Sequence, residues 1–128
     1  MSILQRRAVA AIKEQVMPRF QAEIDGSLGK PLAIEVDWEG VGAMDADSLR
    51  GFFESRWMNS LAEAVKAVCI DDIGKSALKE GLNKVVIRAA KGNEEVSLGF
   101  DAGVLTMVVG SWSFMGADSI QRCLETNL

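Results

Sequence analysis

Apolar and polar residues alternate with a period of two along much of the stretch from Lys84 to Val109. This period is typical of strands that turn one face toward a core and the other face away from it. Glycine-containing segments at 91–93 and 101–103 break the pattern and favour tight turns. The pattern therefore predicts three short strands joined as an antiparallel meander over residues 84–109.

The predicted meander has two unequal faces. One face is apolar and is expected to point into the core; it holds Val85, Ile87, Val96, Leu98, Phe100, Leu105, Met107 and Val109. The opposite face mixes β-branched and polar residues; it holds Val86, Arg88, Ser97, Gly99, Val104, Thr106 and Val108. Exposed valines beside charges are a usual feature of an interface. Alternatively, these valines reflect only the preference of β-branched residues for strands.

A further strand is predicted over residues 32–39. It would have an apolar face and an acidic face, formed by Ile34, Val36 and Trp38 and by Glu35, Asp37 and Glu39. Antiparallel sheets often bury one face and leave the other in water. The acidic face is therefore expected on the outside of the protein.

A helical repeat of apolar residues precedes this strand. The first helix is predicted to begin after Ser2, a good N-cap, and to run toward Ile24. Pro18 lies inside this helix and should kink or split it, because proline lacks the N–H donor and crowds the preceding turn. A turn over 25–31 then leads into the strand.

Three more helices are expected after the first strand. The longest covers residues 45–68 and carries an apolar stripe that is rich in aromatic residues at its start. A short helix is predicted over 75–82. A connection over 110–116 leads to the last helix, which starts at Asp118 with Gln121 completing a capping box.

The predicted elements follow the order α-β-α-(α)-β-β-β-α within one globular domain, residues 1–128. We expect an α+β fold with a mostly antiparallel four-stranded sheet. The sheet would combine the strand near 32–39 with the meander over 84–109, and the helices would pack on one of its faces.

The net charge of −4 is concentrated in one part of the chain. Residues 31–72 hold nine acidic and three basic side chains, whereas residues 1–30 hold five basic and three acidic ones. This balance argues against a nucleic acid or an anionic membrane as partner, because both attract basic surfaces. No apolar run approaches the ~20 residues that a bilayer span needs. The protein is therefore expected in the cytoplasm.

The chain contains no histidine, so it lacks the commonest general base near neutral pH and the commonest metal ligand. Cys69 and Cys123 lie far apart in apolar helical contexts. We expect both to be reduced, buried thiols that pack as small apolar residues.

Three short stretches approach catalytic motifs without completing them. Residues 74–76, Gly-Lys-Ser, match the end of a phosphate-binding loop, but they follow a predicted helix and lack the glycine five residues earlier. Ser76 and Lys79 have the spacing of a serine–lysine pair, without its companion motifs. Ser113 is not in a nucleophile elbow, because Phe114 replaces the closing glycine. We therefore predict no catalytic residue, no cofactor and no metal.

The main candidate site is a group of five carboxylates, Glu35, Asp37, Glu39, Asp45 and Asp47. Such a group could dock a basic protein, and the complex would then depend on salt. The simpler interpretation is a solvated strand face followed by the N-caps of a helix.

In size and acidity the chain is similar to bacterial secretion chaperones and to toxin-neutralising immunity proteins. This resemblance implies a small cytoplasmic protein that binds another protein and catalyses no reaction. The expected binding surface joins the five carboxylates to Val86, Val104 and Val108. The partner would be a basic protein, or a second copy of the chain that pairs through the sheet.

Two other functions remain open. The chain could be a homo-oligomeric module that binds a small molecule between the sheet and the aromatic residues Phe52, Phe53 and Trp57. It could also be an enzyme that uses a divalent metal held by carboxylates, for which the ligands would be Asp37, Asp45 and Asp47.

Overall fold

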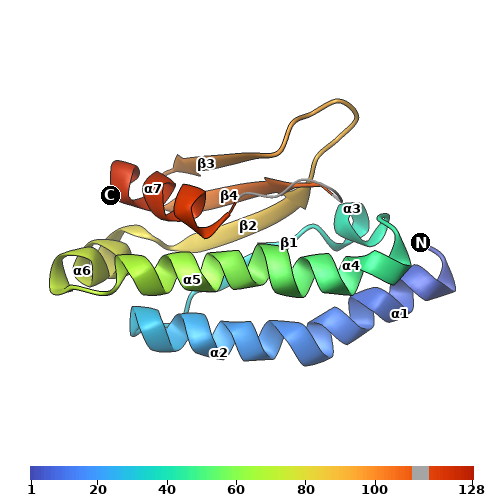
Figure 1. Cartoon of the computed structure of the whole chain (residues 1–128), viewed down its shortest axis with the longest axis horizontal. Helices are drawn as coiled ribbons and strands as arrows, with labels where there is room; N and C mark the ends of the chain where they lie inside the picture. The colour runs from blue at the N-terminus through green and yellow to red at the C-terminus, as the bar shows by residue number, and fades with distance from the viewer. Residues whose placement is uncertain (111–115) are drawn as a thin grey trace.

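The computed structural model describes residues 1–110 and 116–128, and it has two layers, helices on one face of a four-stranded sheet (Figure 1). The helical segments are α1 (Ile3–Ala11), η1 (Ile12–Val16), α2 (Met17–Leu28), α3 (Trp38–Gly42), α4 (Ala46–Phe52), η2 (Phe53–Met58), α5 (Asn59–Val68), α6 (Asp72–Gly81) and α7 (Ala117–Asn127). The strands are β1 (Ala33–Val36), β2 (Lys84–Ala89), β3 (Ser97–Asp101) and β4 (Val104–Val109). The predicted α+β class is thus confirmed.

The first helical segment is continuous from α1 through the π-helical η1 to α2, and it extends past the predicted end at Ile24. Ser2 caps it as expected, because its hydroxyl accepts the N–H of Gln5 at 3.1 Å while the Gln5 side chain accepts the N–H of Ser2 at 2.8 Å. The wide π turns lie just before Pro18 and accommodate its missing donor without a break. Gly29 ends the helix in the left-handed conformation, with φ 80°.

The sheet is mixed and mostly parallel, so the prediction of a mostly antiparallel sheet is wrong. The strand order is β1-β2-β4-β3, in which β2 pairs parallel with β1 and with β4, and β3 pairs antiparallel with β4. Strand β4 lies between β2 and β3, so these two strands are not neighbours and the predicted antiparallel meander over residues 84–109 is also wrong. The two central strands, β2 and β4, are rich in β-branched residues, as strands buried in parallel sheets usually are.

The strand predicted over 32–39 is shorter than expected, because β1 ends at Val36. Asp37 instead caps α3, and its side chain accepts the N–H of Gly40 at 3.2 Å. Glu39 consequently lies in a helix. The predicted acidic strand face is therefore wrong, since Glu35 is its only member that lies on the strand.

The later helices match the predictions in position but not at every end. The long helix runs through α4, η2 and α5, and α6 begins at Asp72, ahead of the predicted start. The N-cap of α7 is Gly116 and no side chain caps this helix, so the predicted capping box at Asp118 is wrong. None of the helices within the described ranges combines the length and apolar character that crossing a membrane requires.

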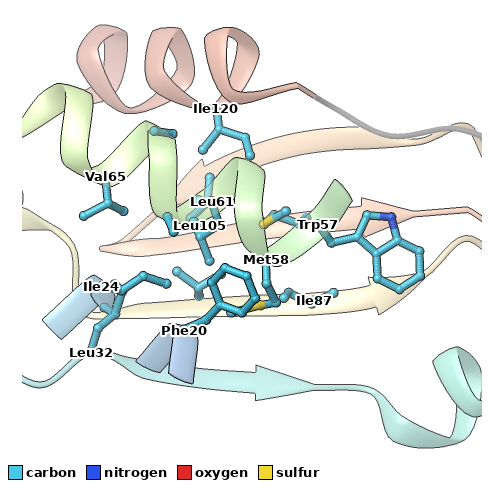
Figure 2. Packing of buried hydrophobic residues seen from close by; sticks show 14 of the residues in the cluster. Phe20, Ile24, Leu32, Trp57, Met58, Leu61, Val65, Ile87, Leu105 and Ile120 are labelled. Carbon is cyan, nitrogen blue, oxygen red and sulfur yellow. The ribbon is translucent and has the colours of Figure 1, made fainter. Parts of the chain in front are cut away.

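The core lies between the sheet and the layer formed by α2, α5 and α7 (Figure 2). Most strand residues predicted to face inward belong to the core: Val85, Ile87, Leu105, Met107 and Val109 are buried, and Leu98 and Phe100 pack against the core half-buried. The prediction is wrong for Val96, which precedes β3 and lies outside the core cluster. The helical layer contributes Phe20, Ile24, Trp57, Leu61 and Ile120.

The two cysteines are unpaired, and each is half-buried, whereas the sequence predicts full burial. Burial raises the pKa of both thiols, and the positive charge of Lys75 opposes this effect at Cys69. Both thiols are therefore protonated at neutral pH and are weak nucleophiles.

Candidate functional site

The face of the sheet that points away from the helices is the candidate site, and we call it the open face. Its residues alternate with the core-facing ones and are Ala33, Glu35, Lys84, Val86, Arg88, Ser97, Gly99, Asp101, Val104, Thr106 and Val108. Helices α2, α5 and α7 lie on the opposite face (Figure 1). A side chain added at Gly99 would meet no described atom within 4 Å, so little covers the open face at β3.

The three valines singled out in the sequence lie in the middle of the open face. The strand register places Val86 beside Thr106 and Arg88 beside Val108, with Val104 at the start of β4. Val86 and Val104 are half-buried. Val108 is only 4% exposed, although it lies outside the main core cluster. The open face thus has an apolar centre that is partly accessible.

Both basic residues of the open face are paired with a carboxylate, and the further carboxylate of Asp101 lies at the end of β3. The ammonium of Lys84 lies 3.1 Å from the carboxylate of Glu35. Arg88 donates two hydrogen bonds of 2.7 Å to the two carboxylate oxygens of Glu94, which lies between β2 and β3. Exposed pairs of this kind contribute little to stability. Together with Asp101, these pairs give the open face two positive and three negative charges, so it is close to neutral.

The Arg88 pair makes Glu94 an unusually strong acid. Hydrogen bonds from Arg88 and from the backbone N–H of Lys91 lower the pKa of Glu94 from 4.5 to about 2. We expect an NMR titration to place its inflection near pH 2, and Arg88→Gln to return the pKa toward 4.5. Because the folded-state pKa is depressed, the stabilisation by this pair is present above pH 4.5 and is lost as the pH falls toward 2. A wild-type inflection at 4.5 would contradict the pairing.

The other four predicted carboxylates lie on α3 and α4, which contact each other, and we call this group the acidic corner. It consists of Asp37, Glu39, Asp45 and Asp47. Asp45 occupies the N-cap position of α4 and accepts a hydrogen bond of 2.9 Å from the Ser48 hydroxyl. Glu39, Asp45 and Asp47 are exposed, whereas Asp37 is half-buried. The five carboxylates therefore form two groups, because Glu35 lies on the open face.

The acidic corner does not form a metal site. Within residues 1–110 and 116–128, no group of three or more His, Cys, Asp or Glu side chains is arranged to hold a metal ion. Asp37 and Asp45 are instead engaged locally at the starts of α3 and α4. The capping interpretation holds for the Asp37 side chain, whereas Asp45 occupies the N-cap position of α4 and its side chain accepts from the Ser48 hydroxyl and not from a backbone N–H.

The aromatic start of the long helix is packed into the core. Phe53 and Trp57 are 0% and 1% exposed, and their rings lie 5.6 Å apart between centroids. Trp38 stacks on Phe53, also with 5.6 Å between the ring centroids. Phe52 is half-buried, and the guanidinium of Arg56 lies 4.6 Å from its ring. Side chains thus fill the region where the sequence suggests a small-molecule pocket.

The residues of the incomplete motifs lie on α6 or outside the described part. The side chain of Asp71 accepts a hydrogen bond of 2.8 Å from the N–H of Gly74, so Asp71 caps α6. Ser76 and Lys79 are exposed on the same helix. Ser113, with Trp112 and Phe114, lies outside the described residues.

No family model matches the chain, and neither a curated protein nor a solved structure matches it. The similarity to secretion chaperones and immunity proteins therefore remains one of size and acidity.

Proposed function

We propose that this protein is a cytoplasmic, non-enzymatic protein-binding module and that the open face is its binding surface. The observation that supports the proposal is the partly accessible strip of Val86, Val104 and Thr106 on a sheet face without a described helix over it. An apolar centre with polar residues around it has the composition of a protein interface. Strands also hold these side chains in fixed positions, which reduces the entropic cost of binding.

The acidic corner gives the proposed partner its charge. Glu39, Asp45 and Asp47 are exposed carboxylates that would attract a basic protein and speed its association at low salt. The partner class that fits both features is a protein with an apolar patch next to lysine or arginine side chains. Immunity proteins and secretion chaperones are the functional classes whose size and acidity the chain shares.

A second copy of the chain is the alternative partner for the open face. The observation that favours it is the local pairing of Lys84 with Glu35 and of Arg88 with Glu94. A nearly neutral face can meet a copy of itself without net repulsion. The two copies would then be related by a two-fold axis, with the same residues on both sides of the contact.

Thr106→Arg tests the open face. The substitution places an unpaired charge in the middle of the apolar strip, and partner affinity should fall at least about tenfold because this charge would be desolvated in the complex. Immobilised wild-type and variant proteins are compared for what they retain from a lysate of the source cell at low and high salt. The affinity of the retained partner is then measured by calorimetry.

Thr126→Arg makes the same chemical change on the exposed surface of α7 and should leave the affinity unchanged. Light scattering separates the two partners, since a homodimer through the open face would lose half its molar mass in the Thr106 variant alone. Equal affinity of the folded Thr106 variant and the wild type would reject the open face as the binding surface.

A further inference from the structure

A hollow of about 430 Å³ lies at one end of the molecule, where α5, α6 and α7 meet. Its apolar lining includes Val68, Ala77 and Leu124. Ile70 and Ile73 stand at its edge and are 86% and 84% exposed. Two isoleucines left almost entirely in water beside a hollow make this end of the protein a strong candidate for contact with another surface.

The charged side chains that line the hollow are acidic, namely Asp71 and Glu125, and the described lining contains no lysine or arginine. Lys75, which follows Gly74 on α6, lies outside this lining. Asp72, at the start of α6, is exposed next to Asp71. We call the hollow and these side chains the acidic groove. Its chemistry calls for an occupant that offers apolar side chains together with positive charge.

The opposite end of the chain offers that combination. In the first turns of α1, Ile3 and Leu4 are 62% and 63% exposed, and Arg6 and Arg7 are exposed beside them. Helix α1 contains no acidic residue, and no ion pair formed by the described residues includes either arginine. We call these four residues the basic tip. Figure 1 shows α1 at one end of the long axis and α6 with the C-terminus at the other.

We propose that the basic tip of one copy docks in the acidic groove of a second copy, so that the chain associates head to tail. The two surfaces match in apolar content and are opposite in charge, and every copy carries both. Because they are different surfaces at opposite ends of the molecule, the contact is heterologous. Each added copy leaves a free tip and a free groove, so the assembly grows into a row unless its rotation closes a ring.

This association goes beyond the proposed protein-binding function, because it does not use the open face. The basic tip does lie beside the acidic corner, since α1 contacts α3 and α4. The open face would stay available along the side of the row. Several open faces in one assembly would raise the avidity for a partner that carries more than one binding site.

The first experiment measures the molar mass of the wild type by sedimentation and light scattering from about 10 µM to about 1 mM, the range in which small interfaces form and dissociate. We expect the mass to rise with concentration and to fall with added salt, since the contact pairs arginines with carboxylates. Leu4→Glu in the tip and Ile73→Lys in the groove should each weaken association at least about tenfold. Both positions are exposed, so the fold should tolerate the changes.

Mixing the two variants tests the head-to-tail arrangement itself. The Leu4→Glu protein keeps an intact groove, and the Ile73→Lys protein keeps an intact tip. An equimolar mixture should therefore form a one-to-one heterodimer that does not grow further, although each variant alone stays monomeric. A contact between identical ends would instead give no heterodimer, and that outcome would overturn the proposal.

Two control variants separate this association from other contacts. Ala22→Glu adds a charge to an exposed position of α2, away from both ends, and should leave association unchanged. Thr106→Arg lies on the open face and should also leave it unchanged. A wild type that stays monomeric throughout, or association lost only in the Thr106 variant, would refute head-to-tail docking and leave the proposed function to its own test.

Discussion

Replacing Phe53 with alanine is expected to lower the free energy of unfolding by about 3–5 kcal/mol. Phe53 is fully buried, stacks on Trp38 and meets the edge of Trp57, so truncation would leave a cavity between two large rings. The core around these rings is closely packed and can refill such a cavity only in part. Urea denaturation followed by circular dichroism measures the change. Since a domain of this size has a total stability of about 5–15 kcal/mol, the variant should be close to unfolding at 37 °C.

Phe52→Ala is the matched control, because it removes the same atoms from the neighbouring position. Phe52 is half-buried, and its ring is covered on one side by the guanidinium of Arg56. We expect a loss of about 1 kcal/mol, the size of an exposed cation–π contact with some apolar burial. Equal losses in the two variants would mean that the aromatic start of the helix is not a packed core. Such a result would support the small-molecule pocket that the sequence suggests between the sheet and these aromatic residues.

The sequence predicts much of the fold because the face of each element is a local property. The spacing of Val9, Ile12, Val16 and Phe20 indicates a buried helical stripe, and all four are buried. The alternation in β2 and β4 likewise separates the core face from the open face. Strand order is not a local property. Alternation indicates toward which face of the sheet a side chain points, but it does not indicate which strands are neighbours. For this reason the insertion of β4 between β2 and β3 could not be predicted.

The acidic site was predicted only in part, and Asp37 explains why. A period of two continues from Glu35 through Asp37 to Glu39, but aspartate is also a preferred N-cap. In the structure Asp37 is the N-cap of α3, so the strand ends at Val36 and Glu39 lies in the helix. Short alternating segments that end in aspartate and glycine carry both signals, and the tertiary contacts decide between them.

The acidic groove was missed for a related reason. Ile70 and Ile73 flank two aspartates in a stretch that the sequence predicts as a break between helices. Single apolar residues are common on protein surfaces, so their presence in a turn does not indicate a binding site. Their exposure follows only from the way α6 turns away from α5. The basic tip carried a clearer signal, since two arginines follow two large apolar residues in a helix without carboxylates.

Gly74→Ala is expected to destabilise the protein by about 1–3 kcal/mol, the usual cost of forcing extra atoms into a packed site. A Cβ at this position would overlap the backbone carbonyl oxygen of Val68, at the end of α5. A backbone atom cannot rotate away as a flexible side chain can, so α6 would have to move from α5. The packing of two helices therefore explains the glycine of the Gly-Lys-Ser match without any phosphate. Urea denaturation measures the loss.

Gly51→Ala is the control with the opposite expected sign. Gly51 also lies in a helix, but a Cβ there would meet no described atom within 4 Å. Alanine should stabilise this position by about 0.5–1 kcal/mol, because glycine loses more backbone entropy in a helix. A Gly74 variant as stable as the Gly51 variant would show that α6 does not pack against the Val68 carbonyl. Val68 and Gly74 both line the acidic groove, so the groove would then not have the shape that head-to-tail docking requires.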